Sequence, residues 1–80
     1  MTYKTTGTCS TQIDLDVEGG IIRNVRFTRG CNANLQGISK LVEGMKAEEA
    51  IEKLRGIKCG ARDTSCPDQL SYAIEAAMNA

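Results

Sequence analysis

The residues best suited to demanding chemistry in this chain are its cysteines, because the sequence contains no histidine and no tryptophan. Thiolates bind soft metals and exchange disulfides. Cys31 follows a strand-like run and Cys66 stands just before Pro67 and an amphipathic stretch, so both fall where a helix is expected to begin. A helix N-terminus has unpaired N–H groups and a positive dipole end, which stabilise a thiolate. The candidate site residues are therefore Cys9, Cys31, Cys59 and Cys66.

The spacing of the cysteines includes no CxxC pair, which weakens a zinc-ribbon interpretation. It leaves a metal site open, because ligands need only converge in space. Without histidine, the ligand set would be four thiolates, or three with Asp63, Asp68 or a solvent molecule. Such soft ligands select zinc, iron–sulfur clusters or Cu(I).

Two structural interpretations compete with a metal site. Free cysteines are often small core residues, but these four stand within two residues of Gly7, Gly30, Gly60 and Pro67, at the ends of elements or in loops. Structural disulfides are the second alternative. The chain begins without an apolar signal region and has no apolar run long enough to span a bilayer. We therefore expect a cytoplasmic location, where cysteines stay reduced.

Charge excludes two classes of partner. Ten basic and ten acidic residues cancel, which leaves no electrostatic footprint for nucleic acid or for an acidic membrane. At 80 residues the core alone is marginal, so a metal or a partner would add useful stability.

The first part of the chain predicts a sheet. Ile13, Leu15 and Val17 alternate with acidic residues, which indicates a half-buried strand, and a second strand follows Gly19-Gly20 over residues 21–28. Residues 2–8 are expected to form a third, edge strand. A two-residue loop would pair Leu15 with Asn24 and mix the faces, so we predict an odd-length loop with a glycine bulge, which places Asp14 opposite Arg26.

From residue 32 the apolar spacing becomes helical. Three helices are predicted, the first ending at Gly44, the second at Gly56, and the third starting with Pro67 at its first position. Their apolar stripes are Leu35, Ile38, Leu41 and Val42, then Ala47, Ala50, Ile51 and Leu54, then Leu70, Ile74, Ala77 and Met78. The fold class is therefore α+β, a three-stranded antiparallel sheet followed by three helices packed on one face in two layers.

The stretch Thr64-Ser65-Cys66-Pro67-Asp68 spells the string TSCPD. The sequence resembles the small stand-alone TSCPD-domain proteins, a four-cysteine family whose function is not established. The resemblance runs over nearly the whole chain and implies one TSCPD-like domain over residues 1–80. Related domains occur at the C-termini of cobalamin-dependent ribonucleotide reductases, which implies a thiol or metal role near that enzyme class.

A more distant resemblance is to iron–sulfur cluster scaffolds of the NifU/IscU type. Gly30-Cys31-Asn32-Ala33 is similar to their cysteine at a helix start, Cys66 to their final cysteine, and Cys9 to their first. This implies a NifU/SufE-like fold with three cysteines at the positions of scaffold ligands. The chain departs from that pattern in having Thr11 in place of an aspartate, Ser65 in place of a histidine, and Cys59 in addition.

We therefore expect a small metal-binding protein whose Cys9, Cys31, Cys59 and Cys66 hold one zinc ion, with an iron–sulfur cluster as the alternative. A fourth cysteine closes the site and favours a retained metal. By itself the domain is not expected to be an enzyme. One rival is a thiol redox protein that uses Cys59 and Cys66, with Cys66 activated at an N-cap position. The other is an accessory module that docks on a larger enzyme such as a ribonucleotide reductase.

Overall fold

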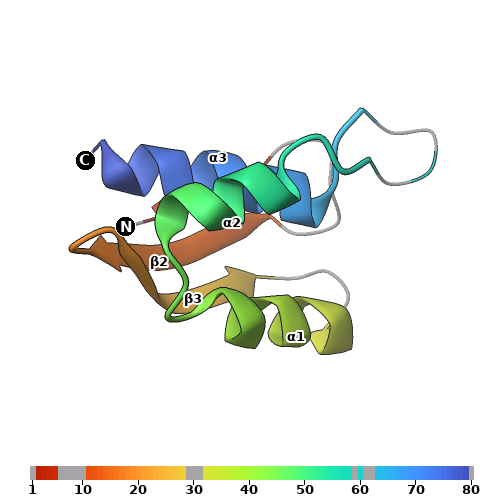
Figure 1. Cartoon of the computed structure of the whole chain (residues 1–80). Helices are drawn as coiled ribbons and strands as arrows, with labels where there is room; N and C mark the ends of the chain where they lie inside the picture. The colour runs from red at the N-terminus through yellow and green to blue at the C-terminus, as the bar shows by residue number, and fades with distance from the viewer. Residues whose placement is uncertain (1, 6–10, 29–31, 59, 61–62, 80) are drawn as a thin grey trace.

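A computed structural model describes residues 2–5, 11–28, 32–58, 60 and 63–79 of the chain. Its elements are β1 (Thr2–Lys4), β2 (Gln12–Glu18), β3 (Ile21–Thr28), α1 (Asn32–Val42), α2 (Ala47–Leu54) and α3 (Cys66–Met78) (Figure 1). The strands form one antiparallel sheet in the order β1-β2-β3. The expected α+β architecture is confirmed, with the strands first in the chain and the helices after them.

The β2–β3 turn differs from the expected one. Glu18 pairs with Ile21, so the loop is the two residues Gly19 and Gly20, not an odd-length loop. Both glycines have positive φ, at 58° and 81°. Positive φ at both central residues is what a type I′ hairpin turn needs, and glycine adopts it without steric cost. The tight turn is therefore the local optimum for this sequence.

A β-bulge further along β3 produces the pairing that the sequence predicted. Near the turn Asp16 pairs with Arg23, whereas beyond the irregularity Asp14 pairs with Arg26, so Leu15 faces two residues of β3. The extra residue is Asn24, whose φ of 55° lies in the left-handed region. The predicted pairing of Asp14 with Arg26 is confirmed, but its predicted cause, an odd loop, is wrong.

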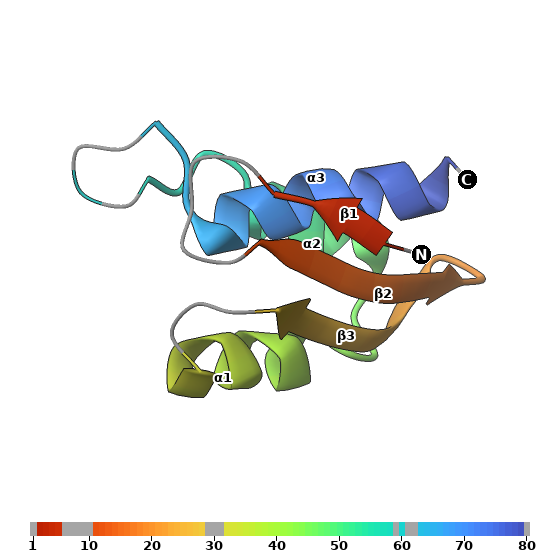
Figure 2. The ribbon, with the colours of Figure 1, turned by 180° about the vertical axis from the view of Figure 1, so that it is seen from behind.

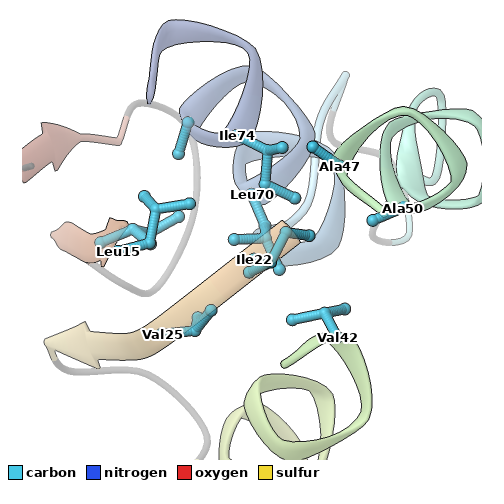
Figure 3. Packing of buried hydrophobic residues seen from close by; sticks show 10 residues of the cluster. Leu15, Ile22, Val25, Val42, Ala47, Ala50, Leu70 and Ile74 are labelled. Atoms are coloured by element: carbon cyan, nitrogen blue, oxygen red, sulfur yellow. The ribbon is translucent and has the colours of Figure 1, made fainter. Parts of the chain in front are cut away.

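The bulge places the apolar residues of β3 on the helix side. Without it, Ile22 and Val25 would point to opposite faces, because side chains alternate along a strand. Both are buried in one cluster together with Ile13 and Leu15 of β2. All three helices contribute residues to this cluster (Figure 3). They contribute Val42 from α1, Ala47 and Ala50 from α2, and Leu70, Ala73 and Ile74 from α3.

Figure 2, seen from behind, shows the sheet in front of α2 and α3, with α1 beside β3. The α1–α2 connection also bonds to the start of β3. The N–H of Ile22 donates to the carbonyl of Met45 (3.0 Å), and the carbonyl of Ile22 accepts from Gly44 (2.9 Å). Further along β3, the N–H of Val25 donates to the Glu43 carboxylate (3.2 Å). The chain thus covers part of the outer edge of its own sheet. No helix among the described residues is long and apolar enough to cross a membrane.

Two residues of the predicted apolar stripes are exposed. Leu41 is 75% exposed, and Met78 is 39% exposed. Each helical residue turns by about 100°, so Leu41 stands well away from the neighbouring Val42, which faces the core. Met78 lies in the last turn of α3, at the rim of a shallow groove that Ile51 of α2 also lines. These two assignments to the core were wrong.

Arg55, which follows α2, fastens the end of that helix to α3. Its Nε donates to the Ser71 hydroxyl (3.2 Å), and its Nη2 contacts Glu75 (3.2 Å). The guanidinium also stacks 4.1 Å from the centre of the Tyr72 ring. The ion pair is largely exposed and contributes little by itself. Together these contacts fix where the chain leaves α2.

The left-handed Asn24 predicts a specific pattern of stability. Asn24→Val should destabilise the protein by about 1–2 kcal/mol, because a β-branched residue tolerates positive φ poorly. Asn24→Gly should be nearly neutral. Urea unfolding measures both, and Arg23→Val, the same exposed substitution one residue earlier at ordinary φ, is the control. Equal stability of the two valine variants would show that the bulge conformation carries no strain.

Candidate metal centre

One end of the molecule gathers several chain ends that are distant in sequence. Lys4 pairs with Gln12, and Gln12 pairs with Thr28, so three strand ends are aligned. The N–H of Thr11 donates to the carbonyl of Thr28 (2.9 Å), and the N–H of Thr5 donates to the carbonyl of Thr11 (3.2 Å). Figures 1 and 2 place the first turns of α1 and α3 at this same end. We call it the loop end.

Cys66 is the first residue of α3 and is half-buried. Ser65 is the N-cap, with extended backbone (φ −150°, ψ 171°), and its hydroxyl accepts the N–H of Asp68 (3.1 Å). The expectation that Cys66 is the N-cap and Pro67 the first helical residue is therefore wrong by one position. Serine is the better cap because a hydroxyl oxygen accepts hydrogen bonds more strongly than a thiol sulfur. The thiol still lies in the positive field of the helix N-terminus.

The loop between α2 and α3 is closed by hydrogen bonds where it begins and ends. We call these residues, Gly56, Ile57, Thr64, Ser65 and Asp68, the neck. The Asp68 carboxylate accepts the N–H of Gly56 (2.7 Å) and the hydroxyl of Thr64 (2.5 Å). The Ser65 hydroxyl donates to the carbonyl of Ile57 (2.6 Å). The neck thus joins the end of α2 to the start of α3.

Two side chains of the neck are shielded from water. Asp68 is only 6% exposed and Ser65 only 4%. Buried polar groups are costly unless they are hydrogen-bonded. Among the described residues, no buried side-chain nitrogen or oxygen lacks a partner. The neck is therefore a satisfied polar cluster at the edge of the apolar core.

The other three predicted ligands, Cys9, Cys31 and Cys59, lie outside the described residues. Of the two alternative ligands, Asp63 is exposed, and both carboxylate oxygens of Asp68 accept hydrogen bonds from the neck. Within the part of the chain that the structure describes, no group of three or more His, Cys, Asp or Glu residues could hold a metal ion. The four-cysteine centre stays a prediction.

A second feature is a groove of about 370 Å³ between β3 and α1. Its lining includes Arg26, Lys40 and Glu43, together with the apolar Leu35. Glu43 already accepts the N–H of Val25, and the Ser39 hydroxyl in the lining donates to the carbonyl of Leu35 (2.8 Å). The first bond joins β3 to the residue that follows α1, and the second lies within α1. The lining residues do not converge on a catalytic arrangement.

Carboxylates on the open face of the sheet are also engaged locally. Hydrogen bonds from Thr2 and then Gln12 lower the pKa of Asp14. A hydrogen bond from Asn24 lowers the pKa of Asp16. Asp14 and Asp16 therefore bind polar side chains of the sheet, as expected for a solvated face.

Comparison with family models shows the relationship that the TSCPD string suggested. The model of the TSCPD domain matches residues 1–78. The chain belongs to the TSCPD domain family. No curated protein and no solved structure matches this TSCPD domain. The expected likeness to iron–sulfur scaffolds remains a prediction.

In this TSCPD domain the five motif residues have distinct structural places. Ser65 caps α3, and Cys66 and Pro67 begin the helix. The Asp68 carboxylate accepts hydrogen bonds from Gly56 and Thr64. Sequence reasoning treated the string as a family signature and overlooked the neck. The available signal was the Ser65-x-x-Asp68 spacing, which is similar to a capping box.

Ser65 gives a prediction for this TSCPD domain. Ser65→Ala should lower the free energy of unfolding by about 1–2 kcal/mol, because it removes a helix cap and a bond to Ile57. Ser39→Ala is the matched control, since Ser39 is also buried but donates only within its own helix. Urea unfolding compares the two. Similar small losses would contradict a special role of the cap.

Proposed function

We propose that this TSCPD domain is a small metal-binding protein in which Cys9, Cys31, Cys59 and Cys66 hold one ion. The observation that carries the proposal is the loop end. The chain leaves the sheet there between Thr5 and Thr11, the segment of Cys9, and between Thr28 and Asn32, the segment of Cys31. The fourth predicted ligand, Cys66, begins α3 at the same end.

The lengths of these segments support convergence. Cys9 is two residues from Thr11, and Cys31 is next to Asn32. Cys59 is two residues beyond Ile57 of the neck, while Cys66 directly follows Ser65. Consecutive Cα atoms are about 3.8 Å apart. Each cysteine is therefore within two residues of a described residue, which limits how far its sulfur can lie from the loop end or the neck.

The donor set favours zinc. Four thiolates complete a tetrahedral zinc shell, which is typical of structural sites without an open position. An iron–sulfur cluster, which four cysteines also hold, is the alternative. The dipole of α3 lowers the cost of the thiolate form of Cys66 in either case. Bound metal would add to the stability of a domain whose core is small.

The position of Cys66 also supports a second candidate function, thiol–disulfide exchange. The Cys66 thiolate would attack a disulfide of a partner and form a mixed disulfide, which Cys59 would resolve. The two cysteines would end as a disulfide, and the partner would receive both electrons as a dithiol. In this alternative the domain is an accessory module of a larger enzyme, such as a ribonucleotide reductase.

Metal analysis tests the main proposal. Protein purified without oxygen should contain about one zinc per chain, and each Cys→Ser substitution at the four positions should reduce binding strongly. Ser39→Ala, which leaves the loop end unchanged, should retain the metal. A strong chelator should lower the melting temperature substantially, because structural zinc contributes on the order of 10 kcal/mol in small domains. Protein without stoichiometric metal would contradict the proposal, and one neutral Cys→Ser variant would reduce it to three ligands.

Thiol reactivity separates the two candidate functions. In metal-loaded protein the four cysteines should react slowly with a thiol reagent at neutral pH, and all should react after metal removal. Coordination occupies the sulfur lone pair, so reactivity should follow metal occupancy. Cys66→Ser identifies the contribution of that thiol. Rapid reaction of Cys66 in untreated, metal-free protein, with reversible formation of a Cys59–Cys66 disulfide, would favour the redox function.

A further inference from the structure

Two side chains of the neck, those of Asp68 and Thr64, join the ends of the loop that contains Cys59 and are not part of the cap of α3. We propose that Asp68 and Thr64 are positioning residues of the metal centre, which hold the Cys59 loop against the end of α3 that carries Cys66. The inference rests on the proposed metal-binding function and adds to it the residues that set affinity. Neither residue is proposed to bind the ion.

The geometry distinguishes Asp68 from an ordinary capping residue. Ser65 accepts the N–H of Asp68 and thereby caps α3. The Asp68 carboxylate takes no part in that cap, because one oxygen accepts from Gly56 and the other from Thr64. Gly56 is the residue at which the chain has just left α2, and Thr64 is the residue before the cap. One buried side chain therefore holds both ends of the loop.

Thr64 is in turn held by α3. Its Oγ1 donates to Asp68 (2.5 Å) and accepts from Nε2 of Gln69 (3.0 Å). Gln69 is 7% exposed, so this bond is also largely shielded from water. The Thr64 hydroxyl cannot be replaced by a methyl group without the loss of both bonds. Thr64 thus connects the far side of the neck to two residues of α3.

The neck matters for affinity because a free loop would have to be ordered when the metal binds. Each residue that is fixed loses backbone conformational entropy, which opposes binding. Hydrogen bonds that fix the ends beforehand reduce the part of this cost that binding must overcome. Groups that orient metal ligands typically change metal affinity by about 10–100-fold when removed. We expect an effect of this size.

Zinc affinity, measured by competition with a chromogenic chelator, tests the inference on the whole chain. Asp68→Ala and Thr64→Val should each weaken zinc binding by about 10–100-fold. Asp68→Asn, which keeps an oxygen for the N–H of Gly56, and Thr64→Ser, which keeps the hydroxyl, should recover most of it. Glu52→Ala is the control, because Glu52 is an exposed carboxylate of α2 that has no proposed part in the site. It should bind zinc as the wild type does.

Two further readouts separate positioning from general stability. The thiolate-to-metal absorption of the cobalt-substituted protein should change in Asp68→Ala and Thr64→Val and return in the conservative variants. In metal-free protein, amide hydrogen exchange at Gly56 should accelerate in Asp68→Ala, while amides of the core strands β2 and β3 keep their protection. Should Asp68→Ala not fold, Thr64→Val and Thr64→Ser carry the test, since they leave the helix cap unchanged.

The outcomes are distinct. Unchanged zinc affinity and cobalt spectra in the two disruptive variants would overturn the inference while the metal site stands. An equal loss in Glu52→Ala would also overturn it, because overall charge rather than the neck would then set the affinity. A wild-type protein that takes up no metal would overturn the proposed function, and this inference with it.

Discussion

The core depends on a single residue of backbone in β3 that has no partner in β2. Gly19 and Gly20 favour the tightest turn, but that turn alone would carry apolar residues of β3 to the solvent side. The left-handed Asn24 absorbs the conflict by shifting the pairing once. Ile22 and Val25 then share the face that the helices cover. The hairpin therefore keeps the tight Gly19-Gly20 turn and still buries the apolar residues of β3. Its one irregular position is Asn24.

Polar contacts organise the other half of the molecule. Arg55 fixes the end of α2 on α3, and directly after it the neck bonds Gly56 to Asp68. Two helices that pack through small residues such as Ala47, Ala50 and Ala73 are thereby fixed at one end by directional bonds. Apolar packing holds α2 and α3 against the sheet. Hydrogen bonds fix the two ends of the loop that connects these helices. Cys66 begins α3 directly after Ser65 of the neck.

Much of the fold follows from periodicity. Alternation in β2 and helical spacing from residue 32 predicted the strands, the helices and their order, because both patterns reflect which residues must be buried together.

The failures have physical causes. Leu41 has the spacing of an apolar stripe, but the buried side of α1 is narrower than that stripe and does not include it. The sequence did not show whether the extra residue of the hairpin lies in the turn or within β3, because that depends on how the whole hairpin packs. The neck was missed since its partners, Gly56 and Asp68, meet only in three dimensions. For the site, the sequence predicts ligand types, and of those ligands Cys66 has a described position.

The covered edge of β3 has a consequence for behaviour at high concentration. Exposed strand edges offer unpaired N–H and C=O groups to other molecules and are the usual starting points of aggregation. Here Met45 and Gly44 occupy the backbone groups of Ile22, and Glu43 takes the N–H of Val25. At the opposite edge, β1 as described is only three residues long and carries Lys4. One edge is thus partly covered and the other is short and charged, and both features disfavour the addition of foreign strands to the sheet.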